Sequence, residues 1–74
     1  MDNQHKKIKG YRDLTQAEID LMNEGKALAE QCREFIEKVE ATQDADQRCA
    51  ALGRTNLQQG FMWAIRAVAR PETF

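Results

Sequence analysis

The side chains best suited to ligand chemistry gather near the start of the chain. Residues 5–15 read HKKIKGYRDLT and contain a cluster of cations, among them Lys7 and Arg12. The only tyrosine, Tyr11, follows Gly10, and a glycine there permits a sharp bend that would aim the ring outward. Nucleobases stack on aromatic rings and cations bind phosphates, so the segment suits a planar anion. It equally suits a solvated basic arm that folds onto the acidic first turn of the following helix.

A second polar set occurs in the later half of the chain. Thr55, Gln59 and Arg66 follow helical spacing and therefore share one helical face. Residues 45–70 contain one acid, Asp46, so few carboxylates accompany this set. Amides together with arginine can hydrogen-bond to bases and phosphates, and the same groups can instead bond between the helices of a bundle. The candidates are Arg54, Thr55, Gln58, Gln59 and Arg66.

The sequence contains no recognisable catalytic or metal-binding set. The only histidine is His5, and the two cysteines, Cys32 and Cys49, fall on the apolar sides of predicted helices, where cysteine packs as a small hydrophobe. Their spacing matches no metal site. In a hairpin that turns near residue 43 the cysteines lie about five residues, or roughly 7 Å, out of level, which argues against an intrachain disulfide. We therefore expect no enzymatic activity and no cofactor.

Length and charge limit the classes of protein to which this chain can belong. Its 74 residues predict one small domain, residues 1–74, with a core worth ~3–5 kcal/mol. The net charge of −1 argues against general DNA binding. No apolar run approaches the ~18 residues that span a membrane, and the N-terminus lacks the apolar stretch of a signal peptide. We expect an intracellular protein in a reducing compartment, with no membrane or DNA partner.

Residues 16–40 predict one long helix. Thr15 and Glu18 match the T-x-x-E capping box that marks a helix start. Apolar residues then recur at spacings of three and four, which predicts a packing seam against a second helix. The predicted seam comprises Leu21, Gly25, Leu28, Cys32, Phe35 and Val39, flanked by Met22, Ala29 and Ile36.

A turn is expected at residues 41–46, ATQDAD, with Asp44 as the N-cap of a second helix and Gln47 at its third position. This helix should run to about Ala69, because Pro71 pushes the residue before it out of helical geometry. So short a link requires the two helices to lie antiparallel. The predicted seam of the second helix comprises Ala50, Leu57, Phe61, Ala64, Ile65 and Val68.

The expected fold is all-α, an antiparallel helical hairpin that follows a short N-terminal segment. Leu52, Met62 and Trp63 lie off the predicted seam, so the second helix has more apolar surface than one neighbour can cover. Two helices also cannot enclose a core by themselves. We therefore expect self-association into an oligomeric helical bundle.

Two glycines fall inside the predicted helices. Antiparallel pairing brings Gly25 and Gly60 to nearly the same level of the hairpin. An interior glycine usually has a packing reason, so close contact between the two helices is the favoured explanation for Gly60. Approach of a ligand or of a partner backbone is the alternative.

Taken together, these segments resemble a known family. HKKIKGYRDLT, EIDLMNEGK and RTNLQQGFMWAIRAVARPE are similar to the phage anti-CBASS protein two family, whose hairpin domain is shared with anti-Thoeris sponges. The stretch LQQGFM with RAVARP is the most specific part, and the acidic turn is the least. The resemblance implies a helical hexamer that binds cyclic dinucleotides such as cyclic GMP–AMP without cleaving them. It would do so in the cytoplasm of the infected bacterial host and starve the defence effector of its signal.

The resemblance also implies roles for individual residues. Tyr11 falls on the family's base-stacking ring and Lys26 on its ligand-contacting lysine, and we assign Gly10, Lys7 and Arg12 to the same dinucleotide site. Some family members hold cyclic trinucleotides in a second pocket shared by several protomers. By position, the second polar set of Arg54, Thr55, Gln58, Gln59 and Arg66 is the candidate for that pocket.

Two other functions stay open on the sequence. One is an oligomeric helical interaction module or antitoxin-like scaffold with no nucleotide ligand, which would not need Tyr11. The other is a weak binder of single-stranded nucleic acid that uses the basic aromatic arm. Such a binder would depend strongly on salt, and the balanced net charge counts against it.

Overall fold

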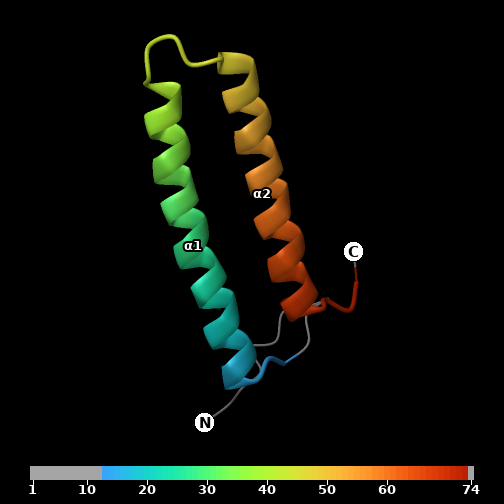
Figure 1. The fold of residues 1–74 in the computed structure, drawn as a ribbon. Coiled ribbons are helices and arrows are strands. Elements are labelled where there is room, and N and C mark those ends of the chain that lie inside the picture. The colour runs from blue at the N-terminus through green and yellow to red at the C-terminus, as the bar shows by residue number, and fades with distance from the viewer. Residues whose placement is uncertain (1–12, 74) are drawn as a thin grey trace.

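Two long helices form an antiparallel hairpin in the computed structural model, which describes residues 13–73 (Figure 1). Helix α1 spans Gln16–Glu40 and helix α2 spans Gln47–Ala69. The described residues contain no strand. The predicted all-α hairpin is therefore confirmed, and the first helix has the bounds that its capping signal and apolar period predicted.

The start of α1 is held by the predicted capping box. The Oγ1 of Thr15 accepts a hydrogen bond from the Glu18 amide at 3.2 Å, and the Thr15 amide donates to Oε1 of Glu18 at 2.9 Å. Each bond satisfies a backbone donor that has no partner within the helix. The sequence predicted this end correctly because every atom involved lies within four residues of chain.

Replacing Thr15 with alanine is expected to remove the acceptor for the Glu18 amide. Loss of such a cap typically costs about 1 kcal/mol, which lowers Tm by about 4–8 °C in a domain of this size. Circular dichroism melts at one fixed protein concentration measure the change. Thr15→Ser keeps the oxygen and should melt close to wild type, so equal melting of wild type and Thr15→Ala would refute a stabilising role for the box.

The second helix is capped by Asp46 and not by Asp44, which corrects the prediction. The Asp46 carboxylate accepts from the amides of Arg48 and Cys49 at 3.0 and 3.1 Å. These backbone bonds, the one from Cys49 first, hold the pKa of Asp46 below its ordinary value. Asp44 instead has a φ of 72° and reverses the chain in the left-handed conformation that aspartate tolerates. It lies too far back to reach the free amides of a helix that begins at Gln47.

The end of α2 is tied back to the start of α1. Arg70 is the C-cap in a left-handed conformation, with φ 43°, and its amide donates to the Arg66 carbonyl at 2.8 Å. Its guanidinium donates to Oε2 of Glu18 at 3.2 Å. The helix ends before Pro71, as predicted. This contact links two residues 52 positions apart and closes the end of the hairpin opposite the turn.

The packing seam of α1 differs from the predicted one by a rotation of the helix. Leu21, Leu28 and Phe35, here called the exposed row, are 52, 46 and 63% exposed. Ala64 of α2 is exposed as well. Two apolar rows run side by side on α1, and an antiparallel partner covers only one of them. The covered row contains small residues that let α2 approach, and it comprises Met22, Gly25, Ala29, Cys32, Ile36 and Val39.

The two helical glycines have different surroundings. A Cβ on Gly25 would lie 2.9 Å from Cδ1 of Ile65, so this glycine permits the close approach of the helices. A Cβ on Gly60 would meet none of the described residues within 4 Å. The packing explanation favoured for Gly60 is therefore wrong within the described hairpin, because Gly60 does not face α1. Gly60 is instead an exposed position of α2.

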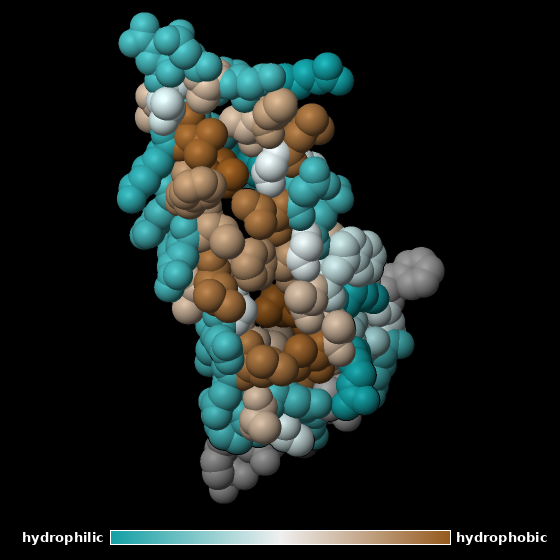
Figure 2. Space-filling view, in the orientation of Figure 1, coloured by the Kyte–Doolittle hydropathy of each residue, from teal (hydrophilic) through white to brown (hydrophobic). Residues whose placement is uncertain are grey.

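The hairpin leaves much apolar surface uncovered. Among residues 13–73 only Ile36, Ala50 and Ala69 are buried. Figure 2 shows hydrophobic side chains in a nearly continuous band along one face, bordered by hydrophilic ones. Monomeric proteins rarely expose large contiguous apolar patches. Neither α1 nor α2 has the length and apolar composition that a membrane span requires.

Candidate functional site

Two hollows lie along one side of the hairpin, between the helices. The central groove, of about 510 Å³, is lined by residues that include Gly25, Lys26, Arg33, Ile36, Arg54 and Gln58. The terminal hollow, of about 670 Å³, is lined by residues that include Met22, Lys26, Met62, Trp63, Ile65 and Arg66. Ile36 of the covered row points toward α2. Around the axis of α1, Arg33 of the central groove lies on one side of Ile36, and Phe35 of the exposed row lies on the other. The hollows and the exposed row therefore lie on opposite sides of the hairpin.

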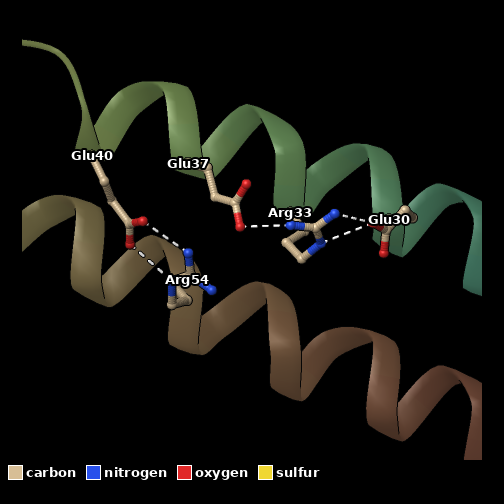
Figure 3. A network of polar contacts seen from close by, with 5 residues as sticks. All are labelled: Glu30, Arg33, Glu37, Glu40 and Arg54. Carbon is tan, nitrogen blue, oxygen red and sulfur yellow. Dashed lines mark hydrogen bonds and ion pairs between the residues drawn. The ribbon is translucent and has the colours of Figure 1, made fainter.

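Ion pairs neutralise the arginines of the central groove (Figure 3). Arg54 of α2 donates two hydrogen bonds to the Glu40 carboxylate of α1, both 2.8 Å long. Arg33 bonds to Glu37 at 2.6 Å and also to Glu30. The bond from Arg54 lowers the pKa of Glu40, and the bond from Arg33 lowers the pKa of Glu30. An anion entering this groove would have to compete with three carboxylates.

The terminal hollow has a different electrostatic character. Its cations are Lys26 of α1 and Arg66 of α2, and no carboxylate is among the described residues that line it. Arg66 donates to the carbonyl of Thr73 at 3.3 Å, which leaves further guanidinium donors available. Lys26 lines both hollows. The floor is apolar, so the hollow can hold a flat organic group with an anion beside it.

The structure places Lys26 on a wall of the site but leaves its predicted companions untested. Lys26 lies on α1, in its third turn, and faces the side where the two hollows meet. Tyr11, Gly10, Lys7 and Arg12 lie outside the described residues. The assignment of these four residues to a dinucleotide site stays a prediction.

The second polar set is divided by the structure. Arg54 and Gln58 line the central groove, whereas Arg66 lines the terminal hollow. Thr55 and Gln59 are exposed on α2 and line neither. Arg54 serves as an interhelical ion-pair partner, the alternative that the sequence had left open. A trinucleotide pocket built from all five residues would need more than one chain, and it also stays a prediction.

Sequence reasoning gave Trp63 no role in a site. It had identified Trp63 and Met62 only as apolar residues off the seam, yet both line the terminal hollow. The signal was present in the spacing, because Trp63 and Arg66 are three residues apart and so lie close together on the helix surface. The spacing does not predict that Lys26 of α1 lines the same hollow as Trp63 and Arg66. That proximity follows from the packing of α1 on α2.

The cysteines take no part in either the ion-pair network or the terminal hollow. Cys32 is half-buried on the covered row and Cys49 is exposed, and both are free thiols. Hydrogen bonding to the Asp46 carboxylate raises the pKa of the Cys49 thiol. This shift disfavours the reactive thiolate. Residues 13–73 contain no cluster of three side chains suited to holding a metal ion.

Comparison with known proteins places the hairpin in a family. Residues 3–69 match the family described as Acb2/Tad1, hairpin domain. The chain is also 35% identical to anti-CBASS protein 2 of Pseudomonas phage JBD67, in a match that covers 97% of this chain and 98% of that protein. Both matches extend across α1, the turn and α2. The chain belongs to the Acb2/Tad1 hairpin-domain family.

Proposed function

We propose that this chain is a phage anti-defence protein that sequesters cyclic dinucleotide signals and does not cleave them. The observation that carries the proposal is the 35% identity, over nearly the whole chain, with a phage protein named for action against CBASS. The terminal hollow supports it, because two cations and an apolar floor suit a nucleotide. Binding in the cytoplasm of the infected host would keep the signal from its effector.

The proposed binding unit contains two copies of the chain. Tyr11 precedes α1 and Lys26 lies about ten residues into that helix, a separation of ~15 Å along its axis. One copy would struggle to bring both side chains to one small ligand. Two copies related by a two-fold axis could each contribute a Tyr11 ring and a Lys26 cation. A cyclic dinucleotide, with its two bases and two phosphates, nearly shares that symmetry.

We propose that the chain self-associates into a hexamer. The support is the apolar surface that a single hairpin leaves exposed to solvent. Seven large hydrophobic residues of the described hairpin are exposed, including the exposed row and Trp63. Gly60 has open space where a Cβ would be, although an interior helical glycine costs about 1 kcal/mol relative to alanine. Because no described residue lies within 4 Å of that position, Gly60 is suited to close approach by another chain.

Recovery of the ligand tests the proposal. The protein, in excess, is dialysed against cyclic GMP–AMP, then denatured, and the released nucleotide is identified by chromatography. We expect the nucleotide to accumulate on the protein side and to be recovered intact, because sequestration needs affinity but no turnover. Recovery of a linear product would establish an esterase instead. Failure to retain any cyclic dinucleotide would favour an oligomeric interaction module, the function that the uncovered apolar surface suits.

A further inference from the structure

Trp63 is the largest exposed aromatic group of the described hairpin, with 61% of its surface accessible. An indole left in water forgoes the stabilisation of burying a large apolar surface. Trp63 lines the terminal hollow with Lys26 from the other helix and Arg66 from its own. Trp63 therefore lies in an open hollow, beside side chains of both helices.

The charges around the ring distinguish a nucleotide from an apolar partner helix. In the central groove Arg33 and Arg54 are paired with carboxylates. In the terminal hollow Lys26 has no ion pair or side-chain hydrogen bond with another described residue. Within residues 13–73 the Arg66 guanidinium donates only to the neutral carbonyl of Thr73. Covering two cations with an apolar surface would cost their hydration without compensation. An anionic group would compensate them.

We infer that Trp63 stacks on a base of the bound nucleotide while Lys26 and Arg66 flank the attached phosphate. The inference rests on the proposed function. To the proposed two-copy site of Tyr11 and Lys26, here called the Tyr11–Lys26 clamp, it adds a second stacking ring, Trp63, and a second cation, Arg66. Met22 and Met62 line the same hollow and provide an adaptable apolar floor for the face of a base. A volume of about 670 Å³ falls in the range of small-molecule sites.

Fluorescence provides a direct test, because Trp63 is the only tryptophan in the chain. Wild-type protein is titrated with cyclic GMP–AMP while indole emission and binding heat are recorded in parallel. We expect emission to change saturably, with the same midpoint as the heat. Stacking on an aromatic ring contributes ~1–3 kcal/mol, so Trp63→Leu should raise Kd by about 5- to 150-fold. Trp63→Phe keeps a ring and should recover part of the loss.

Asn56→Ala is the control. Asn56 is also an exposed residue of α2, but it lines neither hollow and is not part of the exposed apolar surface. It should bind like wild type, and the oligomer mass of every variant is measured by light scattering. Arg66→Gln should raise Kd as well and reduce the salt dependence of binding.

The outcomes separate this inference from the proposed function. Binding heat without any emission change, together with wild-type affinity in Trp63→Leu, would overturn the stacking role and leave sequestration standing. Absence of heat from wild type would overturn both. If Trp63→Leu lowers the oligomer mass and emission changes on dilution without ligand, Trp63 belongs to an interface between copies and the inference is wrong.

Discussion

Tyr11→Ala is expected to weaken the binding of cyclic GMP–AMP strongly in a calorimetric titration. Wild type should bind with submicromolar Kd at about one ligand per two protomers, because two copies complete each site. Each ring contributes ~1–3 kcal/mol of stacking and the variant removes both rings from a site. The expected weakening is therefore roughly 30- to 20,000-fold. Tyr11→Phe keeps the ring and should retain most of the affinity, which separates stacking from any role of the hydroxyl.

Lys26→Ala tests the electrostatic half of the same clamp. It should weaken binding and flatten the dependence of Kd on salt, since fewer phosphate charges are neutralised by the protein. Lys38→Ala is the control, because Lys38 is an exposed cation of α1 that lines neither hollow. If Tyr11→Ala and Lys26→Ala both bound like wild type, the two-copy clamp would be wrong. The same result would also count against the Lys26 contact proposed for the terminal hollow.

Phe35→Glu is expected to break the assembly. Phe35 is the most exposed member of the exposed row, at 63%, and burying it against another copy is the expected source of association energy. A glutamate there would carry an unpaired charge into an apolar interface, which is strongly unfavourable. In light scattering, wild type should have about six times the 8.5 kDa mass of the chain. The variant should approach the mass of one or two chains.

Ala27→Glu supplies the matched control for the added charge. Ala27 is exposed on α1, and helical periodicity places it on the side facing away from α2, so its variant should assemble normally. Because the proposed ligand site uses two copies, Phe35→Glu should also lose cyclic GMP–AMP binding while its hairpin stays helical by circular dichroism. A Phe35→Glu protein that kept the wild-type mass would show that copies associate through another surface.

Local interactions explain what could be predicted from the sequence. The capping box of Thr15 and Glu18, the stop before Pro71 and the antiparallel turn of residues 41–46 each depend on neighbours a few positions away. The helical period of the apolar residues then requires a hairpin. Even the misplaced cap was an error of two residues, because Asp44 and Asp46 are both suited by type to a helix start or a turn.

The relations between the helices were decided by the tertiary structure. Two apolar rows on α1 were equally eligible by period, and the row with Gly25 and Ala29 is covered because small residues allow a closer approach of α2. That rotation also determines which charges meet. It pairs Arg54 with Glu40, 14 residues away, and so removes a free cation from the central groove. Such pairs depend on how far each helix is rotated about its own axis. The spacing of residues in the sequence does not specify that rotation.

The candidate site shows the same division. Composition and resemblance identified Lys26 on α1 and Arg66 on α2, but assigned them to two separate sites. Packing places them around one hollow with Trp63, which the sequence had marked only as surplus apolar surface. The residue types were readable from the chain because each has its own chemistry. Their convergence was not, because it follows from the depth and rotation at which one helix packs on the other.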